Sequence, residues 1–456
     1  MTPLSPADQL FLWMEKRQQP MHVAGLQLFN FPEDAGPRYI RDLVEHLRTF
    51  TEPQHPFNKR LVRRFGQYFW ETDKQFDLEH HFRHRALPKP GRIRELLSYV
   101  SAAHSNLMDR QRPLWEVHLI EGVQGRRFAL YTKVHHSLFD GISAMRMGSR
   151  ALSTDLDARD LPPIWAMPPR RKPAGLPNPI DVATGAVRMT SGFSKQMATM
   201  PAVLKEISKV ARKSQRDPNF VPFMNAPASI INSDITGSRR FAAQSYPMAR
   251  FKAIGKAFGC TLNDVVLAVC GSALRNYLIS QQALPDKPLI AMVPVSLRTD
   301  DSETGNQIAM ILANLGTEVA DPTLRLERVR ASVQEAKTRY KSMSSAELLN
   351  YTALMMAPAG LHLLTGLAPR LRAFNVIISN VPGPKEPLFW NGARMTGQYP
   401  VSIPVDQVAL NITLTSYVDH LEFGLTACRR TLPSMQRLLG YLELGIHELE
   451  VAGGLR

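Results

Sequence analysis

Two adjacent histidines, His135 and His136, lie in the stretch KVHHSLFDG, which continues to Asp140 and Gly141. The run before them, FALYTKV, has the composition of a β-strand. Neighbouring side chains of a strand point to opposite faces, so we expect one imidazole to face a cleft and the other to pack behind it. Gly141 permits a sharp turn before the helical run ISAMRMGSRAL, and it adds no side chain to obstruct a channel.

This pattern is suited to removing a proton from a hydroxyl group. A neutral imidazole can accept that proton near neutral pH, and such a base typically contributes about 10²–10⁴-fold to a rate. Because an alcohol is too weak an acid to ionise first, proton removal must accompany attack on an electrophile. Asp140 either orients the imidazole or fixes the loop through a cation elsewhere.

The motif has three other interpretations: a metal site, a serine hydrolase and a purely structural role. A metal site is disfavoured because adjacent histidines diverge on a strand and no further ligand follows at a useful spacing. A serine hydrolase needs a G-x-S-x-G turn, which the sequence lacks. The remaining alternative is that both histidines are hydrogen-bonded core residues without a chemical role.

Composition limits the class of protein and its partners. The 456 residues suffice for two or three domains, and the net charge of +15 favours anionic partners such as a phosphate-bearing co-substrate or an acidic lipid surface. Without a zinc-finger, RRM or basic-zipper pattern, we expect no nucleic acid partner. The three cysteines, Cys260, Cys270 and Cys428, are typical of free thiols in a reducing compartment. The N-terminus does not resemble a signal peptide, so we expect a cytoplasmic protein.

Three regions follow one another along the chain. Residues 1–150 and 241–456 show mixed strand and helix patterns, whereas 151–240 begins with many prolines and continues as a basic, amphipathic stretch over 186–216. Helices are predicted over 39–50, 93–107, 248–258, 262–280, 324–343 and 433–451. Strands are predicted over 23–29, 114–120, 128–134, 289–295, 374–380, 408–417 and 420–427. The apolar run 348–369 approaches the length of a membrane span, but its prolines favour a broken, buried segment.

HHSLFDG resembles the HHxxxDG motif of the superfamily of chloramphenicol acetyltransferase, plant HxxxD acyltransferases and peptide-synthetase condensation domains. Further blocks narrow this resemblance: the opening PLSPADQLFLWMEKRQQPMHVAGLQLF, PLW at 113–115, ND at 263–264, VPVSLR at 293–298 and SNVPGP at 379–384. Together they resemble the bacterial wax ester synthase/acyl-CoA:diacylglycerol acyltransferase family over nearly the whole chain.

The resemblance implies an α/β (α+β) fold of two chloramphenicol-acetyltransferase-like domains, with mixed sheets flanked by helices and a long crossover between them. It implies an O-acyltransferase that moves a long-chain acyl group from acyl-CoA to a fatty alcohol or diacylglycerol, without a cofactor or metal. The active site is expected in a tunnel between the domains. The alternatives are a condensation-type enzyme using carrier-bound substrates and a non-catalytic scaffold on lipid surfaces.

Within this family, His136 would be the general base and His135 its buried neighbour, and no acyl-enzyme would form. The resemblance implies that Asp140 pairs with Arg298 and shapes the loop. Asn263 is expected to donate a hydrogen bond near the reacting centre, or to belong to the helix start after Thr261. The remaining expected site-shaping residues are Pro113, Leu114, Trp115, Asp264, Ser379 and Asn380.

Two further expectations concern surfaces. The phosphates of CoA are expected to meet either the cluster at 170–172 or Arg239 and Arg240, and the sequence does not decide between them. The basic stretch favours peripheral association with an anionic membrane face or a lipid droplet, although a solvated helix between domains is the alternative. The sequence gives no oligomeric state.

Overall fold

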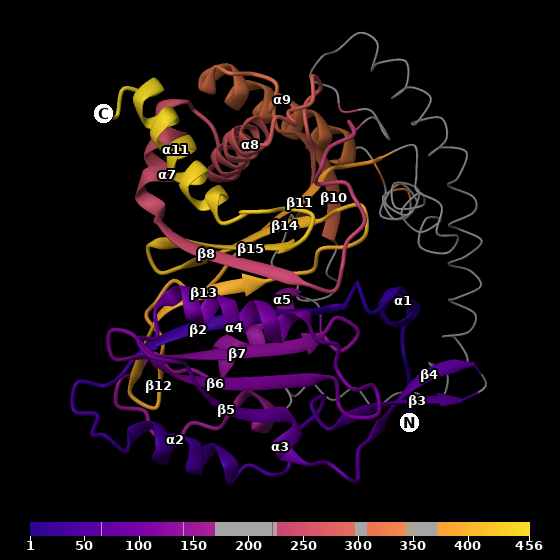
Figure 1. Ribbon diagram of the computed structural model, residues 1–456, viewed down its shortest axis with the longest axis vertical. Helices are drawn as coiled ribbons and strands as arrows, with labels where there is room; N and C mark the ends of the chain where they lie inside the picture. Colours follow the sequence, from indigo (N-terminus) through magenta and orange to yellow (C-terminus); the bar gives the residue numbers. More distant parts are fainter. Residues whose placement is uncertain are drawn as a thin grey trace. The chain divides into compact units, whose positions relative to one another are not determined.

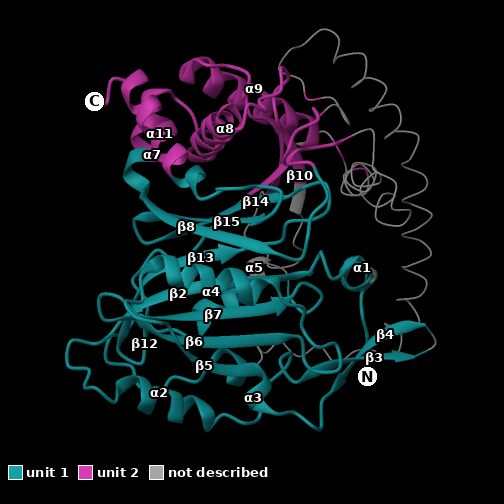
Figure 2. Ribbon diagram, viewed as in Figure 1, with its two compact units in different colours: residues 1–169, 233–250, 379–439 teal, residues 170–232, 251–378, 440–456 magenta. Residues whose placement is uncertain are grey.

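The computed structural model describes residues 1–64, 66–139, 141–168, 221, 226–296, 308–341, 343, 347 and 372–456. Two compact units are coloured separately in Figure 2, one comprising 1–169, 233–250 and 379–439, the other 170–232, 251–378 and 440–456. These units group segments that are close in space, whereas the expected ranges 1–150, 151–240 and 241–456 follow chain order. Those ranges therefore stay a prediction.

The first six-stranded sheet has the strand order β12-β13-β2-β7-β6-β5 (Figure 1). Its strands are β2 (His22–Asn30), β5 (Phe82–Ala86), β6 (Trp115–Val123), β7 (Arg127–His135), β12 (Phe389–Trp390) and β13 (Ala393–Val401). β5 runs parallel to β6, and the other neighbours are antiparallel. A segment near residue 400 thus extends a sheet that is otherwise built from the first 135 residues.

Apolar side chains cover both faces of this sheet. On one face, α2 (Tyr39–Arg48) buries Ile40, Leu43, Val44 and Leu47, a spacing that places them on one side of a helix. On the opposite face, α4 (Ile93–Ser105) buries Leu96 and Val100. The central strand β7 therefore alternates between two cores: its even-numbered residues Phe128, Leu130 and Val134 join the first, and its odd-numbered residues Ala129 and Tyr131 the second.

The second six-stranded sheet has the order β10-β9-β11-β14-β15-β8, and a small sheet has the order β1-β4-β3. Their strands are β8 (Arg239–Pro247), β9 (Ile290–Ser296), β10 (Ile308–Asn314), β11 (Val376–Val381), β14 (Leu410–Tyr417), β15 (His420–Cys428), β1 (Thr2–Pro3), β3 (Lys59–Arg64) and β4 (Gln67–Thr72). β9 pairs parallel with β11 and antiparallel with β10. Parallel and antiparallel pairs thus coexist with helices, which confirms the mixed α/β class.

The remaining helices connect or cover these strands. They are α1 (Pro6–Met14), α3 (Leu78–His81), α5 (Gly141–Arg150), η1 (Ile164–Ala166), α7 (Met248–Ala257), α8 (Leu262–Ser280), α9 (Pro322–Lys341) and α11 (Arg437–Ala452). Within the described ranges, no single helix is long and apolar enough to cross a bilayer, although α7 and α8, bent by 102°, pass that test as a pair. The apolar run 348–369 and the basic stretch 186–216 lie outside the described residues.

Most predicted elements are confirmed to within a few residues. The strand predicted over 128–134 is β7, and the helix predicted over 262–280 is α8. Eight of the described strands were not predicted: β1, β3, β4, β5, β8, β10, β12 and β13. Two of them, β8 and β13, are long strands at positions for which no element was predicted. Each forms by pairing with a partner far along the chain: β8 with β15, and β13 with β2.

Candidate active site

The end of β7 gives the two histidines different surroundings. The backbone N–H of His135 donates to the carbonyl of Leu114 at 3.0 Å, and that of His136 to the carbonyl of Met21 at 2.9 Å. His135 is fully buried, whereas His136 is half-buried. His135 is the last residue of β7 and His136 the first residue of the turn after it, so the strand end leaves one histidine buried and the next half-buried.

Both ring nitrogens of His135 face protein groups. Nδ1 accepts the backbone N–H of Ser137 at 3.1 Å and lies 2.7 Å from the hydroxyl oxygen of the same residue. Nε2 lies 3.3 Å from Oε2 of Glu15. A ring held in this way is suited to supporting its neighbour rather than to meeting a substrate.

The ring of His136 stacks on a phenylalanine from α1. The ring centroids of Phe11 and His136 are 4.0 Å apart, and the planes are inclined by 17°. α1 is started by Ser5, whose hydroxyl oxygen accepts the Asp8 N–H at 3.1 Å. The stacking restricts how the imidazole can turn.

Glu15, the residue that follows α1, is a buried carboxylate with several donors around it. Its oxygens accept from the Met21 N–H at 3.1 Å and from Arg110 Nε at 3.0 Å, besides facing His135. Burial alone raises the pKa of Glu15, but His135, the Met21 N–H and Arg110 together outweigh it and hold that pKa below its ordinary value. The carboxylate is therefore charged near neutral pH.

Sequence reasoning missed both Phe11 and Glu15 as site residues. The opening segment contributes to the family resemblance, but no single residue in it was predicted to belong to the site. The available signal was their spacing: four residues on a helix place two side chains on the same face, one turn apart.

A charged cluster lies on the face of the sheet to which the odd-numbered residues of β7 point. Lys133 is fully buried, stands opposite Glu116 in the β6–β7 register, and places Nζ 3.1 Å from its carboxylate. Its Nζ also donates to the carbonyls of Ala103 and Asn106 at the end of α4. His118 completes the cluster, with Nε2 3.2 Å from Glu116.

The titration of Glu116 reflects this cluster. Burial raises the pKa of its carboxyl, but the contacts with His118, Lys133 and Arg83 outweigh burial and bring the pKa to about 2. Burial lowers the pKa of Lys133, and the nearby carboxylate opposes that change. Each charge is tolerated in the interior because its partner is present.

Pro113, Leu114 and Trp115 are all buried and belong to the scaffold around β6. The indole Nε1 of Trp115 donates to the Phe57 carbonyl at 2.8 Å, and its ring stacks on His81 with centroids 4.5 Å apart. The Leu114 carbonyl is the acceptor for the His135 backbone. This block therefore supports the strand end that carries the motif.

Asn263 and Asp264 lie at the start of α8, in the other compact unit. Thr261 is the N-cap, and the Asp264 carboxylate accepts its backbone N–H at 3.0 Å, which closes a capping box. Asp264 is buried and Asn263 half-buried. The helix start thus accounts for Asp264 by capping, while a role of Asn263 toward substrate stays a prediction.

The other expected site residues are placed unevenly. Ser379 and Asn380 are half-buried on β11, before a turn at which the Gly383 N–H donates to Ser416 Oγ at 3.0 Å. Gly141 begins α5. Asp140 and Arg298 lie outside the described residues, so their pairing stays a prediction.

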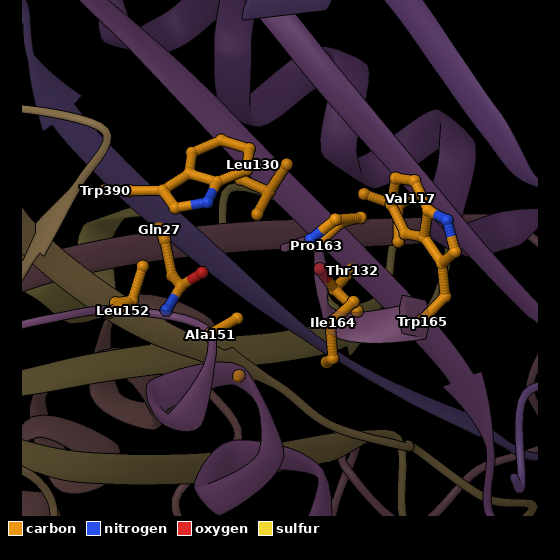
Figure 3. A pocket seen from close by; sticks show the side chains of 11 residues that line it. Gln27, Val117, Leu130, Thr132, Ala151, Leu152, Pro163, Ile164, Trp165 and Trp390 are labelled. Carbon is orange, nitrogen blue, oxygen red and sulfur yellow. The ribbon is translucent and has the colours of Figure 1, made fainter. Parts of the chain in front are cut away.

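A small pocket lies between the first sheet and α5 (Figure 3). α5 begins at Gly141, the last residue of the histidine motif. Its lining is mainly apolar and comprises Gln27, Val117, Leu130, Thr132, Gly148, Ala151, Leu152, Pro163, Ile164, Trp165 and Trp390. The free space is about 20 Å³, roughly that of one water molecule. In this conformation the pocket is therefore too small for a long acyl chain.

The cysteines are placed as packing residues. Cys270 is fully buried in α8, and burial raises the pKa of its thiol to about 12. Burial also raises the pKa of Cys260. For Cys428, burial raises the pKa, but hydrogen bonds from Thr236 and Thr431 outweigh it and bring the pKa to about 7, although the side chain is fully buried. Within the described ranges, no group of three or more His, Cys, Asp or Glu residues could hold a metal ion.

Of the two clusters expected at the CoA phosphates, 170–172 lies outside the described residues. Arg239 is buried, and its guanidinium donates to the carbonyls of Thr236 and Gln18. Burial lowers its pKa to about 10. Its contacts are those of a structural arginine, whereas Arg240 is half-buried.

Solved structures share this fold. The first condensation domain of the CDA synthetase is similar to this structure with a TM-score of 0.58 at 15% identity, covering 99% of this chain and 96% of that one. At that identity the likeness shows the fold alone. A wax ester synthase/diacylglycerol acyltransferase from Marinobacter aquaeolei VT8 is similar with a TM-score of 0.82 at 54% identity, covering 100% of both chains.

Residues 4–266 match the wax ester synthase/diacylglycerol acyltransferase catalytic domain, and 304–450 match the C-terminal domain of the same family. The chain is 50% identical to the O-acyltransferase WSD of Acinetobacter baylyi, over 99% of this chain and 97% of that one. It is 44% identical to a putative diacylglycerol O-acyltransferase of Mycobacterium tuberculosis, over 99% of this chain and 100% of that one. The protein belongs to the wax ester synthase/diacylglycerol acyltransferase family and is an acyltransferase.

Replacing Glu116 with Gln should destabilise the protein in a pH-dependent way. The folded-state pKa of about 2 lies below the ordinary 4.5, so the stabilisation is complete above pH 4.5 and is lost as the pH falls toward 2. A difference of that size corresponds to about 3 kcal/mol. In thermal unfolding, the Tm gap between wild type and Glu116→Gln should narrow from pH 6 to pH 3.

The control is Glu52→Gln, which alters an exposed carboxylate and should leave Tm unchanged at both pH values. A gap of equal size at pH 6 and pH 3 would show that Glu116 is not stabilised as a charged group.

Proposed function

We propose that this chain transfers a long-chain acyl group from acyl-CoA to the hydroxyl of a fatty alcohol or a diacylglycerol. The products are a wax ester or triacylglycerol and free CoA. The acceptor hydroxyl and the thioester are both uncharged, so the reaction requires a base at the moment of attack rather than a preformed alkoxide.

His136 is the general base of this proposal. The observation that carries it is the half-buried imidazole at the end of β7, stacked on Phe11 and anchored through its backbone N–H, beside a His135 ring that is enclosed. The imidazole takes the acceptor proton while the hydroxyl oxygen forms a bond to the thioester carbonyl carbon. The carbon–sulfur bond then breaks, and the proton passes to the departing CoA thiolate.

His136→Ala should abolish ester formation while leaving Tm unchanged, because a half-buried ring contributes more to chemistry than to the core. Purified enzyme would be given radiolabelled palmitoyl-CoA, without any carrier protein, and either hexadecanol or diacylglycerol, with products separated by thin-layer chromatography. His80→Ala, at an exposed histidine, is the control and should keep full activity. Turnover retained in His136→Ala would defeat the mechanism, and wild-type protein that binds lipid without turnover would favour the scaffold.

No acyl-enzyme should form on the way to product. The three cysteines are the strongest nucleophiles in the chain, yet two of them are fully buried and the pKa of Cys260 is raised by burial. Intact-mass measurement of enzyme mixed with palmitoyl-CoA alone should therefore show no added acyl group. A stable acyl adduct, or parallel lines in initial-rate plots against both substrates, would indicate a two-step reaction instead.

We also propose that the enzyme works at an anionic lipid surface, such as the inner membrane face or a lipid inclusion. The net charge of +15 supports this, because a positively charged protein is attracted to acidic headgroups. Salt screens this attraction and weakens it. The protein should sediment with phosphatidylglycerol vesicles at low salt and be released at high salt. Equal sedimentation with phosphatidylcholine vesicles, independent of salt, would contradict an electrostatic attachment.

A further inference from the structure

The last turn of α1 contacts both rings of the histidine pair. Phe11 stacks on His136, and Glu15, four residues later, lies 3.3 Å from His135 Nε2. Residues at this spacing project from one side of a helix. The same side of α1 therefore meets the enclosed imidazole and the half-buried one.

The carboxylate of Glu15 uses its two oxygens for different partners. Oε1 accepts from Arg110 Nε at 3.0 Å and lies 2.9 Å from Nη2, which donates to the Leu12 carbonyl at 2.6 Å. Oε2 accepts from the Met21 N–H at 3.1 Å and faces His135 Nε2. The Glu15 side chain is only 4% exposed, so water cannot readily replace these donors.

Met21 connects this carboxylate to the backbone of His136. Its N–H is held by Glu15, and its carbonyl accepts the His136 N–H at 2.9 Å. Met21 itself is buried. One carboxylate thus holds the ring of His135 directly and the backbone of His136 through one residue.

The surroundings of His135 favour one position for its ring proton. The Ser137 N–H donates to Nδ1, so Nδ1 must act as an acceptor. A neutral ring then has its proton on Nε2, the nitrogen that faces the carboxylate. A carboxylate oxygen 3.3 Å away favours a proton on that nitrogen, whereas a donor at the same place would favour the opposite tautomer and disrupt the turn at 135–137.

We propose that Glu15 is a positioning residue that fixes the tautomer of His135 and the backbone of His136, an inference that rests on the proposed role of His136 as base. Glutamine cannot replace it. Its single oxygen can serve either Arg110 or the pair formed by Met21 and His135, and its amide group would then face the other donors.

Glu15→Gln should lower kcat about 10- to 100-fold, by analogy with the loss of outer partners that orient metal-binding histidines. The KM for palmitoyl-CoA should stay unchanged, because no substrate contact is altered. Asp109→Asn is the matched control. Asp109 precedes Arg110 in the sequence, and its exposed carboxylate pairs with Arg112, so the variant should keep wild-type kcat. A merely structural role would reduce the amount of folded protein without changing kcat per folded molecule.

A spectroscopic measurement tests the placement without relying on activity. In full-length protein labelled with ¹⁵N-histidine, His135 should show a protonated Nε2 and an unprotonated Nδ1, assigned by the loss of its signals in His135→Asn. Glu15→Gln should shift this ring toward the Nδ1-protonated form. If that variant fails to fold, Glu15→Asp keeps the charge for Arg110 but shortens the reach, and it should lower kcat at unchanged KM.

The outcomes separate the two proposals. Wild-type kcat together with an unchanged His135 tautomer in the folded variant would overturn the role of Glu15 while ester formation stands. A wild-type protein that forms no ester, but whose His135 tautomer still depends on Glu15, would overturn the proposed function and support the placement of the ring.

Discussion

The alternation of side chains along β7 is the constraint on which the site depends. This strand lies between β2 and β6, so its backbone is fixed on both sides and its residues must point in turn to two different cores. His135, the last residue of β7, is enclosed in the interior, whereas His136, the first residue of the turn that follows, is half-buried.

That arrangement requires buried charge, which is costly unless each group has a partner. Lys133 and Glu116 satisfy each other across the strand register, and the end of α4 supplies carbonyls to the ammonium group. Glu15 lies one residue beyond α1, and its carboxylate contacts Met21, Arg110 and His135, which come from three separate segments. The polar groups behind the motif are thus arranged before any substrate arrives, which is how an enzyme limits reorganisation during reaction.

Residues of the other sequence blocks also support strands and helices. Trp115 stacks against His81 and donates a hydrogen bond to the Phe57 carbonyl, so it helps to hold β6 in place. Asp264 closes the start of α8 by capping. Residues that carry a family resemblance can therefore serve to hold strands and helices in place, as well as to perform chemistry.

The sequence by itself determined the local features, namely the approximate bounds of α8 and β7 and the mixed α/β class, because side-chain periodicity is set by neighbouring residues. The tertiary structure decided the rest. β13 joins a sheet whose other main strands lie more than 250 residues earlier, and Glu15 reaches His135 across 120 residues of chain. Such partners are chosen by strand register and by the need to satisfy buried polar groups, and neither is visible in a local pattern.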